Sequence, residues 1–384
     1  MKIAGKISLI CLLCFAVANA NALKSTSDSP DPEKPGKYPV GVTTVLLVDH
    51  ERHNIVTDGP RCLMTEIWYP AADETQDLPR RGLMDTYFLE IPDAAFGLIE
   101  AITDVDLREF DHKFEFYAVR DARIRDGRFP LILFSHGSVA TRCQSLFWCE
   151  HMASHGYIVA APDHTGNAIV TFIDGKPVTA KDRDMGHFAD VRPQDLMFVL
   201  DQLTRMEKGA DSRFMDKIDL DNVGVSGHSY GGYTAVEMAD REPRVDAIAP
   251  MAGVCLDRTN FECPALVLLA TEDDTLGLDR NDTMREYYAE SKGPRYFVEF
   301  LNAGHFTFTE IGQILPDFGD GIGKGKRVTN GEPLTFISRE KALPLINGYT
   351  TAFFGKYLKG LDAYDSYLQK NHDPNELVVE WSVP

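Results

Sequence analysis

The stretch VGVSGHSYGG, residues 223–232, places Ser229 between glycines at the spacing of a nucleophilic serine. A strand-like run, NVGVSG, leads into it, and a helix-compatible run, YTAVEMAD, follows at once. In such a nucleophile elbow the serine projects above the sheet from a strained turn. Strand and helix come so close there that side chains two positions away would collide, and Gly227 and Gly231 supply the missing bulk. We therefore predict that Ser229 is a catalytic nucleophile in acyl transfer.

A serine hydroxyl needs a base, and the base needs a carboxylate that fixes its tautomer. In folds with this elbow the chain order is serine, acid and histidine, each after a strand. His305 follows the strand-like run RYFVEFL and is the predicted base. The EDDT that follows ALVLLAT offers Glu272, Asp273 and Asp274. We predict Asp274 as the acid, because the side chain must reach back from the loop rather than remain at the strand end.

An acyl-transfer site also needs amide donors for the oxyanion. They usually come from the residue after the nucleophile and from the loop after the third strand. Here these donors are the backbone N–H groups of Tyr230 and, after LILFSHG, of Ser138. Gly137 would let the backbone approach the substrate closely. His136 and His228 also occupy motif positions, and we interpret them as packing or hydrogen-bonding neighbours.

These residues must be positioned by a sheet, whose strands the sequence supplies as short apolar runs. In chain order the runs are VTTVLLVD (from Val42), LMTEIWYP (Leu63), PLILFSH (Pro130), YIVAAPD (Tyr157), NVGVSG (Asn222), DAIAPMAG (Asp246), ALVLLAT (Ala265) and RYFVEFL (Arg295). Helical periodicity lies near residues 143–154, 192–206, 230–240, 283–291 and 338–359. Because runs such as LVLLA lack polar alternation, we predict a doubly wound, mostly parallel α/β sheet covered on both faces.

Two segments depart from this alternation. Residues 72–128 contain the amphipathic stretch DAAFGLIEAI, which we interpret as an extra packed helix followed by a strand. A cap over the substrate cleft is the alternative interpretation of this insertion. Residues 315–333 contain GIGKGK, but a phosphate-binding loop needs glycine where Asp320 stands and serine or threonine where Arg327 stands. We predict a mobile surface loop there.

The chain of 384 residues can bury a large core, and its composition divides it into three parts. Residues 1–22 have two lysines, a short apolar run and then small residues, the order of a cleaved secretory signal. Residues 23–38 are rich in proline, serine and charge and are predicted as a flexible linker. A single domain is expected over residues 39–384. We expect a secreted or periplasmic protein with no stable membrane insertion.

The chain is acidic and keeps several cysteines after the signal. Its formal net charge is −19, and removal of Lys2 and Lys6 would make it −21. Such a charge argues against nucleic acids and anionic membranes as partners. The cysteines that would remain are Cys62, Cys143, Cys149, Cys255 and Cys263. In an oxidising compartment the close pairs 143 with 149 and 255 with 263 are candidate disulfides, and Cys62 is expected to be a buried thiol.

The motifs form an ordered series: YPVGVTTVLLVD, TEIWYPA, FPLILFSHG, SHGYIVAAPDHTGN, RPQDLMFVLDQL, GHSYGG, ATEDDT and NAGHFTF. This series resembles the secreted bacterial α/β-hydrolases called predicted dienelactone hydrolases, which are similar to platelet-activating-factor acetylhydrolases. The resemblance covers nearly all of residues 39–360. It implies an α/β-hydrolase fold, with a mostly parallel eight-stranded sheet and helices on both faces. It also implies carboxylic-ester hydrolysis through an acyl-serine, with no metal or organic cofactor.

Departures from the resembling families bear on substrate and acid. True dienelactone hydrolases use a cysteine where Ser229 stands, so their substrate is not inherited. In the animal acetylhydrolases the acid follows an earlier strand, whereas AIAPMAGV carries none at that point. This supports Asp274, with Asp257 just beyond as a rival. The loop after the third strand and the ATEDDT end also resemble cutinase-type polyester hydrolases.

The sequence thus predicts a secreted serine carboxylesterase acting on a small-molecule, lipid or polymer ester. The alternatives within enzymes are a phospholipid acetylhydrolase or lipase, a cutinase-like polyester hydrolase and, less favoured, a peptidase with the same triad. The alternative of another class is a catalytically inactive hydrolase-fold binding protein. Such proteins usually lose a triad member or the elbow glycines, and none of these is missing here. Acyl size, disulfide pairing and oligomeric state stay open.

Overall fold

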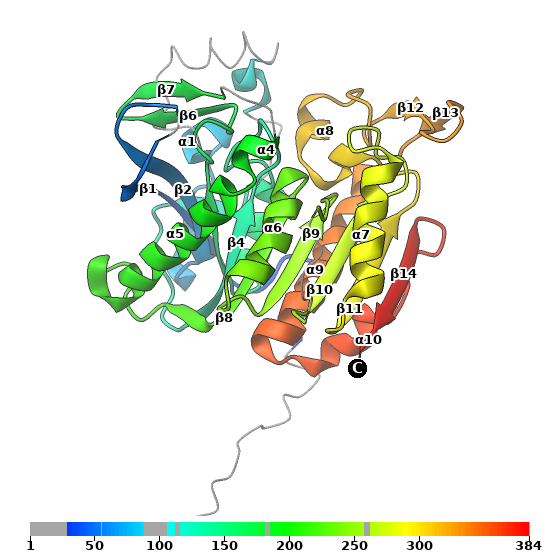
Figure 1. Ribbon diagram of the computed structural model, residues 1–384. Helices are drawn as coiled ribbons and strands as arrows, with labels where there is room; N and C mark the ends of the chain where they lie inside the picture. The colour runs from blue at the N-terminus through cyan, green and yellow to red at the C-terminus, as the bar shows by residue number, and fades with distance from the viewer. Residues whose placement is uncertain are drawn as a thin grey trace, which may run out of the picture.

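A twisted sheet forms the centre of the molecule, with helices on both sides (Figure 1). The computed structural model describes residues 29–54, 56–87, 106–111, 116–180, 185–256 and 262–383. Within these residues the main sheet has ten strands in the order β14-β11-β10-β9-β8-β4-β5-β2-β1-β3. The α/β-hydrolase fold predicted from the motif series is confirmed.

The main-sheet strands are β1 (Val40–His53), β2 (Pro60–Pro70), β3 (Ala118–Arg120), β4 (Phe129–Ser135), β5 (Ile158–Pro162), β8 (Ile218–His228), β9 (Ala247–Met251), β10 (Ala265–Ala270), β11 (Arg295–Phe300) and β14 (Leu377–Ser382). Two hairpins lie outside it, β6 (Val170–Ile173) with β7 (Lys176–Thr179) and β12 (Lys324–Lys326) with β13 (Pro333–Thr335). Strands β4, β5, β8, β9, β10 and β11 pair in parallel, whereas β1 with β2, β2 with β5 and β11 with β14 are antiparallel.

The helices are α1 (Leu83–Tyr87), α3 (Leu146–Ser154), α4 (Met185–Phe188), α5 (Val191–Arg205), α6 (Tyr230–Arg241), α7 (Leu278–Glu290), α8 (Ile311–Ile314), α9 (Arg339–Lys359) and α10 (Asp365–Leu368). Short or irregular turns of helix are η2 (Asp73–Asp77), η3 (Leu107–Phe110), η4 (Met206–Ala210), η5 (His305–Phe308) and η6 (Asp362–Tyr364). Within the described residues, none of these helices combines the length and the apolar character that a bilayer crossing requires.

The sheet buries both of its faces, which explains why its central strands read as continuous apolar runs. Figure 1 shows α5, α6 and α7 across one face, where Leu200, Val236 and Met284 join the core. On the other face, α3 and α9 contribute Trp148 and Phe354 to a second core cluster. All residues of β4, β5, β9 and β10 are buried.

All eight predicted strands are present, and the main sheet has two more at its edges. β3 pairs in parallel with β1, and β14 pairs antiparallel with β11. β3, with three residues, is too short to show a period, whereas LVVEWS of β14 carries a strand signal in its Val and Trp residues that sequence reasoning missed. The prediction of a mobile surface loop over residues 315–333 is wrong in part, because Lys324–Lys326 pairs with Pro333–Thr335 in a hairpin.

The N-terminal segment differs from its prediction. Residues 29–38 are anchored to the domain rather than forming a flexible linker. The Gly36 N–H donates to Ser154 Oγ over 2.7 Å, and the Tyr364 hydroxyl donates to the Pro30 carbonyl over 2.8 Å. Proline and charge argued for flexibility, but the backbone of this segment finds partners on α3 and near η6. The predicted signal, residues 1–22, lies outside the described residues.

Two further expectations depend on the described residues. The predicted helix DAAFGLIEAI falls outside them, although the flanking parts of the insertion pack on the domain: the Trp68 indole N–H donates to the Tyr87 hydroxyl over 3.0 Å. The five cysteines Cys62, Cys143, Cys149, Cys255 and Cys263 are free thiols, so neither candidate disulfide is formed. Cys62 is buried, as expected.

Candidate active site

Ser229 lies on a one-residue turn between β8 and α6. Its backbone φ of 57° and ψ of −119° are unusual for a residue with a side chain, and such strain costs about 1–3 kcal/mol. Both flanking glycines are sterically required. A Cβ on Gly231 would overlap the Ser135 carbonyl, and a Cβ on Gly227 would overlap the backbone of Gly231. The local geometry is therefore that of a nucleophile elbow.

The predicted base, His305, is buried at the start of η5 and is paired with a carboxylate. Its Nδ1 lies 2.8 Å from Oδ2 of Asp273, whose side chain is wholly buried. The prediction that Asp274 orients His305 is therefore wrong. Asp274 is exposed, and its backbone N–H donates to Asp320 Oδ1 over 3.1 Å. The rival Asp257 lies outside the described residues.

The acid is the second carboxylate after β10 because of how the loop turns. Asp273 Oδ1 accepts the Leu276 N–H over 2.8 Å, which holds the carboxylate inside the turn. Glu272 is used elsewhere: it accepts from Arg327 over 2.7 Å and so ties the β12–β13 hairpin to the sheet. Asp320, which stands where a phosphate-binding loop would need glycine, accepts the backbone N–H of His305 over 2.9 Å. It therefore links the acid loop to the histidine loop.

The loop after β4 approaches the elbow closely. A Cβ on Gly137 would lie 3.4 Å from the Ser229 Cβ. The next residue, Ser138, is half-buried, and among the described residues its N–H donates to no protein acceptor. Tyr230, the other predicted donor, is the first residue of α6, whose N-terminus favours negative charge. The structure thus brings the predicted oxyanion residues to the two segments that border Ser229.

The two remaining motif histidines are hydrogen-bonding neighbours, as interpreted from the sequence. His136 Nδ1 lies 2.6 Å from the Gly137 carbonyl, and its Nε2 accepts the His164 N–H over 3.1 Å. His228 is bonded to the carbonyl of His305 over 2.8 Å. Burial, together with the nearby His305, holds the pKa of His228 well below its usual range. Neither ring is available as a second base.

Comparison with known proteins assigns the chain to a family. A PET hydrolase-like family model matches residues 121–324, which is more than half of the chain. The chain belongs to the PET hydrolase-like family. A model of platelet-activating factor acetylhydrolase, isoform II, matches residues 23–205. The two matches overlap over residues 121–205, which include β4, the loop after it and α5.

Several relatives of this PET hydrolase-like chain are named as esterases. A probable 1-alkyl-2-acetylglycerophosphocholine esterase of Arthroderma benhamiae is 25% identical over 62% of this chain, and the match spans 62% of that protein, less than two thirds of it. Platelet-activating factor acetylhydrolase of Canis lupus familiaris is 25% identical over 91% of this chain and 82% of its own. A solved ferulic acid esterase from Streptomyces cinnamoneus is 28% identical, with a TM-score of 0.67, covering 85% of this chain and 92% of its own.

Beneath the elbow lies a buried polar network that sequence reasoning missed. Arg192 of α5 is wholly buried; it donates to the His136 carbonyl and, over 2.9 Å, to Ser135 Oγ, and its guanidinium lies 4.5 Å from the Tyr230 ring centroid. Arg192 therefore contacts both segments that carry the predicted oxyanion amides, the one after β4 and the start of α6. Burial lowers the pKa of Arg192 to about 9, which leaves it protonated at neutral pH. The RPQDL motif contained this residue, but nothing in its pattern indicated contact with the elbow.

A second Ser–His–Asp chain continues this network. His164 Nε2 lies 2.9 Å from Ser135 Oγ, and its Nδ1 lies 2.9 Å from Asp195 Oδ2. All three side chains are wholly buried, so a substrate cannot reach this hydrogen-bonded Ser–His–Asp arrangement. Burial, with the nearby Arg192, lowers the pKa of His164 to about 3 and keeps its ring neutral. The arrangement is structural, and it shows why residue types alone do not identify a catalytic triad.

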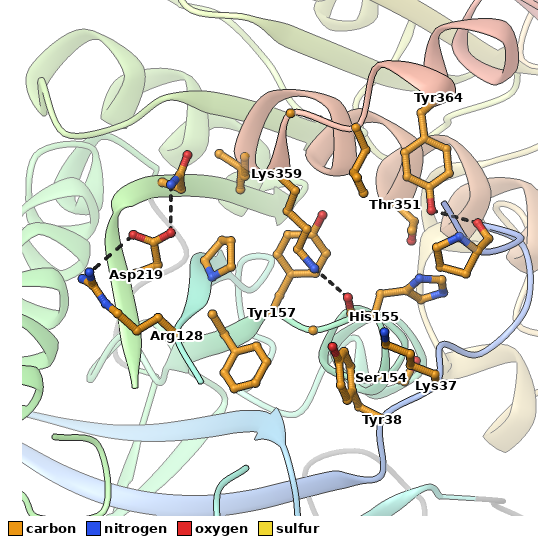
Figure 2. A pocket seen from close by; sticks show the side chains of 18 residues that line it. Lys37, Tyr38, Arg128, Ser154, His155, Tyr157, Asp219, Thr351, Lys359 and Tyr364 are labelled. Carbon is orange, nitrogen blue, oxygen red and sulfur yellow. Dashed lines mark hydrogen bonds and ion pairs between the residues drawn. The ribbon is translucent and has the colours of Figure 1, made fainter. Parts of the chain in front are cut away.

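A cavity of about 730 Å³ opens elsewhere in the molecule, at the amino ends of the parallel strands (Figure 2). Phe129 at the start of β4 and Asp219 near the start of β8 line it, with Lys359 from the end of α9. Ser229 follows the other end of β8, roughly 30 Å away along the strand at about 3.3 Å per residue. This cavity is therefore separate from the candidate site. Among the described residues, no group of three or more His, Cys, Asp or Glu side chains is arranged to hold a metal ion.

Proposed function

We propose that this protein is a serine-dependent carboxylic ester hydrolase with Ser229, His305 and Asp273 as its catalytic residues. The observation that carries the proposal is the buried hydrogen bond between His305 Nδ1 and Asp273, at the same sheet edge as the strained Ser229. Strands β8, β10 and β11 are linked by parallel pairing, so the residues that follow them share one edge. The esterase names of relatives such as the solved ferulic acid esterase support the same reaction class.

In this mechanism Asp273 holds the Nδ1 proton of His305, which leaves Nε2 to take the proton of the Ser229 hydroxyl. Ser229 Oγ attacks the ester carbonyl, and the amides of Ser138 and Tyr230 hold the oxyanion. His305 returns its proton to the departing alcohol. Water, activated by His305 in the same way, then releases the acid and restores Ser229. Asp273 stays ionised and stabilises the imidazolium in both steps.

The substrate class is an ester with an apolar acyl or aromatic group. Three large apolar side chains lie exposed after strands at this edge: Leu256 after β9, Leu278 at the start of α7 and Phe318 after β11, with 55%, 36% and 44% of their surface exposed. The ring of Phe318 meets that of Phe306, next to His305, at 4.8 Å between centroids. A phospholipid acetylhydrolase is the second candidate, favoured by the acetylhydrolase family match over residues 23–205.

Export is part of the proposal. The lysines, apolar run and small residues of positions 1–22 support cleavage by a secretory peptidase, and the acidic composition of the chain suits a protein without nucleic acid partners.

The test is hydrolysis of p-nitrophenyl esters from acetate to palmitate by the parent and by Ser229→Ala. We expect the parent to turn over and Ser229→Ala to lose essentially all activity, because the nucleophile is gone. Ser366→Ala, which changes an exposed serine on α10, is the matched control and should retain parental rates. A short-chain optimum supports an esterase, and an optimum at long chains on micelles supports a lipase.

A fluorophosphonate probe separates catalysis from binding. It should label the parent and Ser366→Ala but leave Ser229→Ala unlabelled. If the probe fails to label the parent, and all esters are left intact, the proposal is wrong and the fold serves as a binding protein.

A further inference from the structure

A chain of side-chain hydrogen bonds connects the oxyanion loop to the histidine loop through the elbow. The Gly137 N–H donates to Gln144 Oε1 over 2.5 Å, and Gln144 Nε2 lies 2.6 Å from His228 Nδ1. His228 Nε2 then lies 2.8 Å from the carbonyl oxygen of His305. The chain thus joins the segment after β4, the residue before Ser229 and the proposed base.

The direction of every bond in this chain is determined by its ends. A backbone N–H can only donate, so Gln144 presents its oxygen to Gly137 and its NH₂ to His228. His228 Nδ1 must then accept, which places the ring proton on Nε2, where it donates to the His305 carbonyl. A single tautomer satisfies both contacts. A second proton on His228 would remove the acceptor that Gln144 needs.

His228 lies where the three segments joined by these hydrogen bonds pack against one another. Its ring is buried, and its centroid lies 4.6 Å from that of His305. A Cβ on Gly137 would lie 3.3 Å from both Gln144 Oε1 and His228 Nδ1, so the three segments are in close contact. With the Gly137 N–H engaged by Gln144, the loop presents the next amide, that of Ser138, to the site.

We propose that Gln144 and His228 are positioning residues of the esterase: they hold His305 and the oxyanion loop at a set distance around Ser229. This inference rests on the proposed function. His228 also stays neutral beside His305, because burial holds its pKa low, so no second charge opposes the imidazolium that forms in catalysis. Misplacing a reacting group by about 1 Å can cost on the order of a hundredfold in rate.

Gln144→Glu tests the direction of the chain. The carboxylate of this variant still accepts from the Gly137 N–H, but it cannot donate to His228 Nδ1. When either the carboxylate or His228 takes up one proton, a hydrogen bond between these two side chains forms again. We expect kcat to fall about tenfold or more at pH 8 with KM little changed. The ratio of variant to parent kcat should rise as the pH is lowered towards 6. Gln369→Glu, which adds the same charge at an exposed position after α10, should keep a ratio near unity at every pH.

His228 variants test the other half of the chain. His228→Leu removes both bonds and should lower kcat by about a hundredfold. His228→Gln keeps an amide donor for the His305 carbonyl and should recover much of that loss, with a melting temperature measured for each variant to exclude unfolding. Parental kcat in folded His228→Leu, or a pH-independent ratio for Gln144→Glu, would overturn the inference. If Ser229→Ala itself stays active, the proposed function fails instead.

Discussion

Asp273 and Asp274 are adjacent in one loop, but they differ in burial and in contact with His305. Asp273 is wholly buried against His305 Nδ1, whereas Asp274 is exposed. We expect Asp273→Asn to lower kcat by on the order of a thousand- to ten-thousandfold, because the amide favours the wrong tautomer of His305. Steady-state hydrolysis of p-nitrophenyl acetate measures this loss.

Asp274→Asn is the matched control, since it makes the same chemical change one residue later. Its kcat should stay within about twofold of the parent, because its side chain does not meet His305. Loss of activity in Asp274→Asn together with full activity in Asp273→Asn would contradict the assignment of the acid.

At the scale of elements, the buried ion pair of Arg61 with Asp195 joins β2 to α5. Arg61 Nε and Nη2 contact the two oxygens of Asp195 over 2.6 and 2.5 Å, and Asp195 also receives Arg52 from β1 and His164. Removal of Arg61 takes away the bidentate partner of a wholly buried carboxylate, whose charge Arg52 and His164 then compensate only in part. We expect Arg61→Met to lower the free energy of unfolding by about 3–5 kcal/mol, as measured by urea denaturation.

An exposed ion pair provides the control for Arg61→Met, because it differs from the Arg61–Asp195 pair in burial. Arg123 contacts Glu74 over 2.8 Å, but more than half of each side chain is open to solvent. Arg123→Met should leave the unfolding midpoint nearly unchanged, because exposed ion pairs contribute little. Equal effects of the two substitutions would show that the α5 anchor does not depend on burial.

At the scale of the whole molecule, two buried carboxyls make stability depend on pH. Burial raises the pKa of Glu310 to about 8 and that of Glu150 to about 7. In the unfolded chain a glutamate titrates near about 4.3. The folded state therefore binds more protons between these values, and stability falls as the pH rises through this window, by at most about 1.4 kcal/mol per pH unit and group.

Glu310→Gln isolates this effect, because its amide oxygen can still accept the Phe147 N–H that Glu310 Oε1 accepts in the parent. Between pH 5 and 8 the free energy of unfolding of the parent should decline relative to that of the variant. Urea denaturation across this range measures the difference. Parallel curves would mean that Glu310 does not titrate differently in the folded and unfolded states.

Local sequence patterns determine much of this protein independently of its tertiary structure. The glycines around Ser229 are needed by the turn itself, and the apolar runs are those of strands buried on both faces, so the nucleophile and the positions of the central strands along the chain follow from short stretches of sequence. The position of His305 follows for the same reason, since it lies in the loop that follows the last parallel strand.

Only the tertiary structure decided which groups meet across the sheet edge. Adjacent loop residues point in different directions, so the choice between Asp273 and Asp274 depends on the turn held by Leu276 and on Asp320, contributed from far along the chain. Gln144 and Arg192 reach the site from other elements, and no local spacing records those contacts. Chemistry at a single residue is encoded locally, whereas its partners are selected by packing between segments that are distant in sequence.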